Sequence, residues 1–409
     1  MNSLLREDLT IKAKRYLRKF CEQIPTRAVG SRGNQIASKF FHQIIQEYGF
    51  EVENQEFDCI HWVYGKVELN IEDKTYPIFA SPYSLGCDIE TSLIQASTLG
   101  NLRSADIEGK VLLLHKEIAK EQVMPKNFPF YNPPEHKALY DLLEMKSPSA
   151  IITASPPNHD MTAALYPFPM FEDGDFDIPS VYTTDEIGEI LATFENKEIR
   201  LISETRRIPS KGENIVARKD DDTGQRVIIV AHIDSKIGTP GALDNASGTI
   251  VLLLLAELLK QYNGKLGIEI VSLNGEDYYD ASGQKLFLEH NKDHFSDIGL
   301  AINIDGVGYK EGKTAYSTYQ CPKKIETTIQ KVFCDQDVYI QGPQWYQSDH
   351  SIFIQQGIPA LALTLQEFEY AWSHIAHTET DVPEIIKPDC LVDISSALFD
   401  LIEALNHSM

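Results

Sequence analysis

Histidine and acidic residues recur along the second half of the chain, and most of them closely follow a short apolar run. They are His232, Asp234, Asp244, Glu276, Asp277, Asp305 and His377. Because the carboxyl ends of strands in an open α/β sheet meet at one edge, we expect these side chains to converge there. Two imidazoles and several carboxylates suit a borderline divalent cation such as zinc. The crowded carboxylates would repel one another without cations, so the pattern predicts a metal site.

Each of these residues has an ordinary structural explanation when it is taken alone. An aspartate after a strand often caps a helix or forms a turn, and a single histidine is often only partly buried. Such explanations do not predict that strand after strand ends in a residue able to bind a metal. The recurrence therefore favours the metal site.

The elements that must position these residues alternate between strands and helices after Pro209. Apolar, β-branched runs predict strands at 214–217, 227–231, 266–273, 298–304 and 360–364. Helical spacing predicts helices at 247–261, 283–290, 323–334, 349–355 and 388–405. Strands separated by helices indicate an α/β fold, in which a mostly parallel mixed sheet is covered by helices on both faces.

The amino-terminal part and the middle of the chain differ from this pattern. Helices are expected at 4–24 and 34–48, whereas the middle of the chain has short strands, many prolines and acidic loops. A length of 409 residues also favours two domains. We therefore expect a discontinuous metal-binding domain of residues 1–64 and 208–409, interrupted by a β-rich insert of residues 65–207.

Composition limits the partners and the location. The net charge of −23 argues against nucleic acid and against an anionic membrane as partners, because both attract basic surfaces. The first eight residues include two acidic residues where a signal peptide has a basic start followed by an apolar core, and no window approaches the apolar length of a membrane span. The six cysteines are scattered without a CxxC pair, which indicates reduced thiols. We therefore expect a cytoplasmic protein.

The order of the motifs resembles that of the M28 family of co-catalytic zinc aminopeptidases. The matching motifs cover about the last half of the chain and are His232-x-Asp234, Gly-Ala-Leu-Asp244-Asn-Ala-Ser-Gly, Asn-Gly-Glu276-Asp277, Asn-Ile-Asp305-Gly-Val-Gly, Gln-Ser-Asp-His350 and His377-Thr-x-x-Asp381. The insert is similar to a protease-associated (PA) domain through two looser motifs, Ile107-Glu-Gly-Lys-Val-Leu-Leu-Leu and Asp177-Ile-Pro-Ser-Val-Tyr-Thr-Thr. The resemblance implies a zinc exopeptidase fold with an inserted PA-like domain.

The resemblance also implies a role for each matching residue. Asp244 would bridge two zinc ions, with His232 and Asp305 on one ion and Asp277 and His377 on the other. Glu276 would be the general base that takes a proton from water and passes it to the leaving amine. Asp234 would orient the His232 imidazole, and Tyr346 would stabilise the oxyanion. The implied activity is an aminopeptidase acting on peptide substrates.

Asp277 departs from the family pattern, which commonly has glutamate at this position. A shorter side chain requires a closer backbone if both zinc ions are to be held.

Arginine usage bears on which end of a substrate is recognised. No arginine follows Arg226, so the motif-bearing stretch cannot supply a guanidinium clamp for a carboxylate. Recognition of a free α-ammonium group is therefore favoured. Arg27, Arg32 and Lys236 remain candidates for carboxylate binding, and a carboxypeptidase is the weaker alternative.

Two further alternatives share the expected fold. His232-Ile-Asp-Ser-Lys236 is similar to the corresponding strand end of glutaminyl cyclases, which are acyltransferases with one zinc. The Asp-Asn-Ala-Ser-Gly run at 244–248 instead resembles the peptidase form. A non-catalytic binding protein on the same fold is the other alternative, although such proteins are expected to lose the metal ligands and the base.

Overall fold

The structure is a computed structural model that describes residues 2–24, 26–157, 163–219, 224–335 and 337–406. The chain forms two compact units, each of which has most of its residue contacts within itself. Unit 1 comprises residues 1–59, 211–278 and 282–409, and unit 2 comprises residues 60–210 and 279–281. The domain boundaries expected from the sequence fall inside the long strands β1 (Glu51–Ile71) and β8 (Glu198–Lys219), which contribute residues to both units.

The sheet of unit 1 confirms the expected α/β class. Its strand order is β13-β12-β14-β11-β9-β10-β8, and β10, β9, β11 and β14 are parallel to one another. β8 pairs with β10, and β12 with β14, in the antiparallel direction. The strands are β9 (Arg226–His232), β10 (Gly267–Leu273), β11 (Ile298–Ile304), β12 (Thr314–Tyr319), β13 (Tyr339–Gln341) and β14 (Ala360–Leu365). β12 and β13 were not expected from the sequence.

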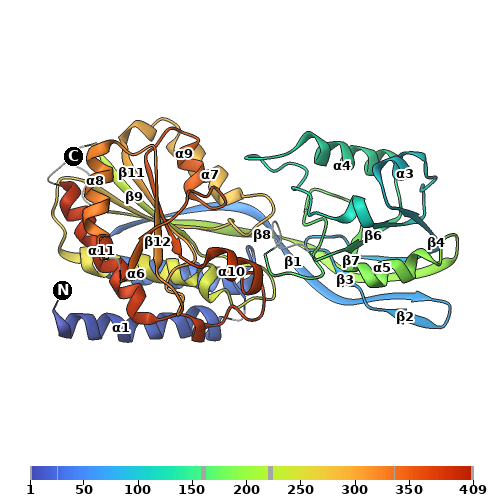
Figure 1. Ribbon diagram of the computed structural model, residues 1–409, viewed down its shortest axis with the longest axis horizontal. Helices are drawn as coiled ribbons and strands as arrows, with labels where there is room; N and C mark the ends of the chain where they lie inside the picture. The colour runs from blue at the N-terminus through green and yellow to red at the C-terminus, as the bar shows by residue number, and fades with distance from the viewer. Residues whose placement is uncertain (1, 25, 158–162, 220–223, 336, 407–409) are drawn as a thin grey trace. The chain divides into compact units, whose positions relative to one another are not determined.

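Helices lie on both faces of this sheet (Figure 1). Helix α6 contacts β9, β10 and β11, and α1, α2 and α11 pack on α6 in turn. Helix α9 contacts β11 and β14. The helices of unit 1 are α1 (Ser3–Arg18), η1 (Lys19–Gln23), α2 (Arg32–Glu47), η3 (Ala242–Ala246), α6 (Ser247–Leu258), η4 (Leu259–Gln261), α7 (Ser282–Asn291), η5 (Phe295–Asp297), α8 (Lys323–Val332), α9 (His350–Ile354), α10 (Phe368–His374), η6 (Pro383–Ile385) and α11 (Pro388–Asn406).

Helix α6 forms the centre of the core of unit 1. Its residues from Ser247 to Ala256 are buried on every side, because the helix lies between the sheet and the outer helices. Among the described residues, the helical stretch Ala242–Gln261 is long and apolar enough to cross a membrane, which the sequence expectation missed. Its most apolar window is 83% buried inside the protein, as in a core helix.

Unit 2 has its own sheet, in the order β8-β4-β5-β6-β7-β3. β4, β5, β6 and β7 are parallel, and β8 and β3 flank them in the antiparallel direction. The elements of this unit are β2 (Lys74–Tyr76), β3 (Phe79–Ala80), β4 (Cys87–Ala96), α3 (Leu99–Ser104), β5 (Val111–His115), η2 (Lys116–Ala119), α4 (Pro134–Lys146), β6 (Ala150–Ser155), β7 (Ser180–Thr184) and α5 (Asp185–Ala192). α3 and α5 were not expected from the sequence.

The strand register of unit 1 brings the motif-bearing loops to one edge. His232 at the end of β9 lies opposite Leu273 at the end of β10, and Ile304 at the end of β11 lies opposite Leu363 in β14. The loops that follow these strands therefore start at the same height along the strand direction, at one edge of the sheet. This alignment is what allows side chains from distant parts of the sequence to meet.

Candidate metal centre

Two groups of side chains at this edge share Asp244. Its Oδ1 lies 3.2 Å from Nε2 of His232, and Oδ1 of Asp305 lies 3.6 Å from the same nitrogen. Its Oδ2 lies 3.1 Å from Nε2 of His377, which in turn is 3.4 Å from Oδ1 of Asp277. Within each group the potential ligand atoms all lie within 4.8 Å of one another. All five residues expected to bind metal therefore meet, with Asp244 between the two groups.

The polar atoms of these side chains fit a cation. Among the described residues, Nδ1 and Nε2 of His232 and Oδ2 of Asp277 are buried without a hydrogen-bond partner. Buried polar atoms are normally satisfied, because leaving them unpaired costs free energy. A zinc ion on the shared edge would satisfy the imidazole nitrogen and draw the carboxylates together. A donor set of imidazoles and carboxylates suits a borderline divalent cation such as zinc.

The charges of the two groups are strongly coupled. Burial opposes protonation of His377, but the carboxylates of Asp244 and Asp277 outweigh it and raise its pKa to about 10. The pKa of His232 is raised in the same way by Asp244 and Asp305. Burial acts to raise the pKa of Asp244, but the two imidazoles outweigh burial, and the pKa lies below its ordinary value. Protons on the imidazoles thus balance the carboxylates in the metal-free protein.

Glu276 lies next to these groups and has an unusual pKa. Its carboxylate belongs with His232 and Asp277 to a third set of potential ligand atoms within 4.8 Å of one another. Burial raises its pKa well above the ordinary value, His232 opposes the shift, and the charges of Asp277 and Asp305 add to it. A carboxylate with a raised pKa accepts a proton more readily near neutral pH, as a general base must.

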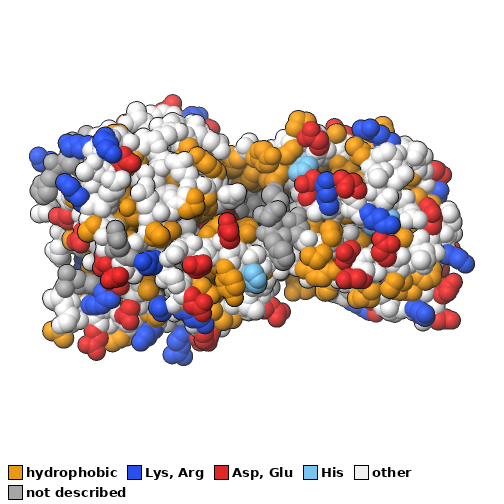
Figure 2. Space-filling model, viewed as in Figure 1, with side chains coloured by type: hydrophobic (Ala, Val, Ile, Leu, Met, Phe, Trp, Pro, Cys, Tyr) orange, Lys and Arg blue, Asp and Glu red, His pale blue; other side chains and the backbone are white. Residues whose placement is uncertain are grey.

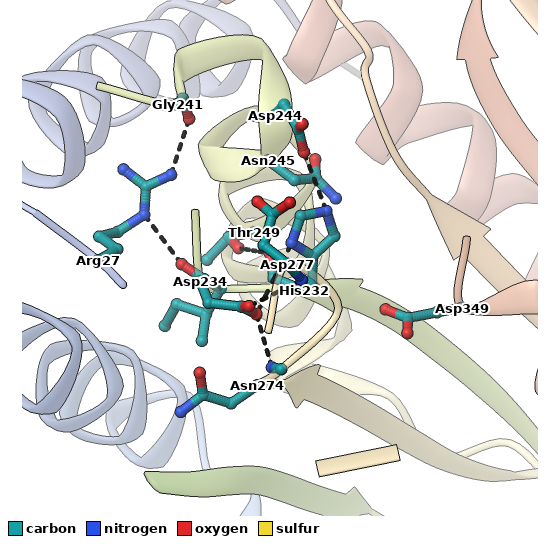
Figure 3. A network of polar contacts seen from close by, with 12 residues as sticks. Arg27, His232, Asp234, Gly241, Asp244, Asn245, Thr249, Asn274, Asp277 and Asp349 are labelled. Carbon is teal, nitrogen blue, oxygen red and sulfur yellow. Dashed lines mark hydrogen bonds and ion pairs between the residues drawn. The ribbon is translucent and has the colours of Figure 1, made fainter. Parts of the chain in front are cut away.

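Asp234 holds the loop that carries Glu276 and Asp277. Its Oδ1 accepts a hydrogen bond from the amide of Gly275 at 2.7 Å, and its Oδ2 accepts one from the amide of Asp277 at 3.0 Å (Figure 3). The contact from Oδ1 to Nδ1 of His232 is longer, at 3.8 Å. Gly275 has a φ of 128°, a conformation that favours glycine. The short hydrogen bonds of Asp234 therefore go to the loop, and the expected contact with His232 is the weaker one.

Asp381 plays a matching part on the loop that carries Asp244. It is fully buried, and its two oxygens accept hydrogen bonds from the amides of Leu243 at 2.6 Å and Asp244 at 3.0 Å. Burial raises the pKa of Asp381 to about 7, and the two amides act in the opposite direction. Asp381 ends the motif His377-Thr-x-x-Asp381, but no role was expected for it from the sequence. Its fixed spacing of four residues after His377 was the available signal.

A polar chain also supports the ligand Asp305. Ser348 Oγ donates to Asp305 Oδ2 at 2.7 Å, and Asn303 Nδ2 donates to Ser348 Oγ at 2.8 Å. Asn303 Nδ2 also lies 3.2 Å from Nδ1 of His350, whose Nε2 lies 2.7 Å from the carbonyl of Trp345. Burial lowers the pKa of His350, so the neutral ring donates to Trp345 through Nε2 and accepts at Nδ1. Asn303, Ser348 and His350 all lie within the motifs quoted from the sequence, but no role was expected for them, because their contacts join separate segments.

Tyr346 lies away from the five ligand residues. Its side chain is 55% exposed, its hydroxyl donates to Oε1 of Gln344 at 3.3 Å, and its ring packs against Tyr319. Within the part of the chain that the structure describes, its hydrogen bonds and ring contact involve Gln344, Gln347 and Tyr319 and none of the metal-binding groups. Its expected role as an oxyanion donor therefore has no contact in this structure to support it.

Three aromatic rings form a row of successive contacts that ends at His377. Trp345 and Phe368 lie 5.4 Å apart by ring centroids, and Phe368 stacks on Trp372 at 5.7 Å. Trp372 then meets the His377 ring edge to face at 5.2 Å. Trp372, at the end of the row, thus packs against the expected ligand His377.

Comparisons with known proteins relate the part of the chain that carries these side chains to a peptidase family. Residues 214–402 match the sequence profile of the family described as Peptidase family M28. Aminopeptidase YwaD of Bacillus subtilis is 26% identical over 191 residues, which are 44% of this chain and 41% of that protein. The chain thus spans less than half the length of the curated relatives that it matches.

Solved structures share the fold over nearly the whole chain. The crystal structure of BSAP, a zinc aminopeptidase from Bacillus subtilis, has a TM-score of 0.74 and 20% identity, and covers 97% of this chain and 95% of that chain. The glutaminyl cyclase of Fimbriiglobus ruber is less similar, with a TM-score of 0.53, 13% identity, and coverage of 96% and 94%.

Proposed function

Because residues 214–402 belong to peptidase family M28, we propose that this protein is a metal-dependent aminopeptidase that removes the amino-terminal residue of peptides. The observation that carries the proposal is the position of Asp244 between two groups of ligands, with Glu276 beside them. The names of the relatives, which include a zinc aminopeptidase, support the same reading.

The proposed centre holds two zinc ions. His232 and Asp305 would hold one ion and Asp277 and His377 the other, with Asp244 shared. The shorter side chain of Asp277 is compatible with this arrangement, because its Oδ1 lies 3.4 Å from Nε2 of His377. When bound, zinc polarises the carbonyl group of the peptide bond and lowers the pKa of a water molecule.

The chain's own groups then move the proton. Glu276 has the raised pKa of a group that accepts a proton from water and returns it to the departing amine. Asp234 keeps Glu276 and Asp277 on one fixed turn through the amides of Gly275 and Asp277. Fixing the base beside the ligands lowers the entropy cost of reaching the transition state.

Recognition of a free α-ammonium group fits the arginine positions. No arginine follows Arg226, and Arg27 donates its hydrogen bonds to main-chain carbonyls inside unit 1. Arg27 is therefore unavailable as a clamp for a substrate carboxylate, which corrects one candidate of the sequence analysis. Arg32 and Lys236 remain as candidates, so the carboxypeptidase alternative is weakened.

The same proposal includes a PA-like insert and a cytoplasmic location. The two PA-like motifs include β5 and β7, which both pair with β6 in one parallel sheet of unit 2. The six cysteines are thiols and none is joined in a disulfide, in keeping with a reducing compartment. Acidic and basic side chains are interspersed over the face seen in Figure 2, and the net charge of −23 disfavours nucleic acid and anionic membranes as partners.

Matched peptides test the proposed activity. We expect release of the first residue from a peptide with a free amino terminus, no release from its N-acetylated form, and unchanged release from its carboxyl-terminal amide. Release from the carboxyl end would indicate a carboxypeptidase. Conversion of an amino-terminal glutamine to pyroglutamate without cleavage would indicate a glutaminyl cyclase. Failure to hold zinc and to cleave any peptide would indicate the binding protein.

A further inference from the structure

Arg27 is a buried cation whose guanidinium donates to four main-chain carbonyl oxygens. It is 1% exposed and lies on the segment between η1 and α2. Its guanidinium donates to the carbonyls of Phe20 at 3.1 Å, Ile233 at 2.9 Å, Pro240 at 2.7 Å and Gly241 at 2.8 Å. Within the part of the chain that the structure describes, no acidic side chain forms an ion pair with it. The four carbonyl oxygens therefore compensate the buried charge, which would otherwise be costly to remove from water.

Two of these carbonyls open the segment that carries the shared ligand. Pro240 and Gly241 lie directly before η3, which contains Asp244. Gly241 has a φ of 60°, and a Cβ atom there would lie 2.7 Å from Nη2 of Arg27 and 2.6 Å from the carbonyl oxygen of Asp244. The backbone therefore approaches the guanidinium more closely than any other residue type would allow.

The opposite end of the same segment is held by Asp381. Its carboxylate accepts the amides of Leu243 and Asp244, and its own carbonyl accepts the amide of Ala242 at 3.2 Å. A cationic side chain thus binds the carbonyls at the start of the segment, and an anionic side chain binds the amides at its end. Figure 3 shows the Arg27 contact to Gly241 on the side of the segment away from His232.

We propose that Arg27 and Asp381 are positioning residues that set the two oxygens of Asp244 between the two metal-binding groups. The segment 240–244 would otherwise bury unpaired carbonyls and amides, and it would lose the single conformation that a shared ligand requires. Arg27 comes from the amino-terminal segment, outside the part of the chain that matches the family profile. Metal binding therefore depends on a residue remote in sequence from all five ligands.

The inference rests on the metal-ligand part of the proposed function. Wild-type protein that binds no zinc would overturn that function as well as the inference. Wild-type protein that binds zinc and cleaves peptides, together with variants that bind zinc equally well, would overturn the inference alone.

The experiment uses the full chain and two mild substitutions. Asp381→Asn keeps the shape but replaces one acceptor by a donor, and Arg27→Lys keeps the charge but loses the planar fork. Arg207→Lys is the matched control, because Arg207 also donates to main-chain carbonyls, those of Tyr83 and Phe176, but does so in unit 2.

Three measurements are made on each variant. They are zinc affinity by competition with a chromophoric chelator, the absorption spectrum of the cobalt(II)-loaded protein, and thermal unfolding of the metal-free protein. We expect both test variants to bind zinc roughly 10–100-fold more weakly and to show an altered cobalt spectrum. Arg207→Lys should lower only the unfolding temperature. Zinc affinities within twofold of wild type in both folded test variants would overturn the inference.

Hydrogen exchange of the wild-type protein covers the case in which a variant fails to fold. The amides of residues 242–244 are expected to be protected in the metal-free protein, because Asp381 already holds them. Exchange at the rate of an unfolded peptide without zinc, and protection only after zinc is added, would show that the metal orders this segment and that the inference is wrong.

Discussion

Asp244 and His377 face each other across 3.1 Å, from Oδ2 of the carboxylate to Nε2 of the imidazole. The other oxygen of Asp244 faces His232 at 3.2 Å. One carboxylate therefore serves two imidazoles that are 145 residues apart in the sequence. This relationship places Asp244 between the two imidazoles, and it leads to the first prediction.

Replacement of single ligands is expected to separate the two metal positions. Asp244→Asn should reduce binding at both positions, because the amide offers only one good ligand atom. Asp305→Asn and Asp277→Asn should each weaken one position and leave the other. Elemental analysis of the dialysed proteins measures this, with about two zinc per chain expected for the wild type. Equal loss from all three variants would contradict a shared ligand.

Glu276→Gln is expected to leave metal binding intact and to remove the base. The amide keeps the size of the side chain but cannot accept a proton from water. We expect kcat to fall by about 10²–10⁴-fold, the usual contribution of general acid–base catalysis. Zinc content of the same preparation is the control. Substantial turnover by a fully loaded Glu276→Gln protein would rule out this residue as the base.

Zinc affinity is expected to rise with pH. The carboxylates around His377 raise its pKa to about 10 in the metal-free protein, so zinc must displace a proton from the imidazole at neutral pH. Binding should therefore release protons into a weakly buffered solution, and the apparent affinity should increase up to about pH 10. An affinity that stays constant from pH 6 to pH 9 would show that His377 is neutral before zinc arrives.

The stability of the metal-free protein should change in the opposite direction. The pKa of His377 is raised from 6.5 to about 10 on folding, so its contribution to the free energy of unfolding is fully present below about pH 6.5. That contribution is lost as the pH rises through about 10. Thermal unfolding of the chelator-treated protein across this range is the measurement, with the zinc-loaded protein, in which the imidazole holds no proton, as the control.

Asp234→Asn is expected to loosen the loop of the base more than it disturbs His232. The carboxylate accepts the amides of Gly275 and Asp277, and an asparagine oxygen can satisfy only one of them. Leaving a buried donor unpaired costs about 1–3 kcal/mol, which the free energy of unfolding should show. We expect kcat to fall and zinc at the His232 position to be retained. Selective loss of that zinc would mean that the 3.8 Å contact with His232 dominates.

The motif-bearing residues and the fold class could be predicted from the sequence, because both depend on local patterns. Apolar runs separated by helical spacing predicted the strands β9, β10, β11 and β14 and the helix α6, and the family profile matches residues 214–402, which contain the motifs. The edge strands β12 and β13 were missed. β13 is three residues long and exposed at two of them, so its pairing with β12 decides its conformation more than its composition does.

The amino-acid sequence by itself determined which residue types end each strand, and hence the ligand types of the proposed centre. Only the tertiary structure decided which of those residues face the proposed centre and which hold the backbone around it. It placed Asp234 and Asp381 against main-chain amides, turned Arg27 inward to main-chain carbonyls, and left Tyr346 exposed. The physical reason is that hydrogen-bond partners depend on how distant loops come together at one sheet edge, and local sequence patterns carry no information about that approach.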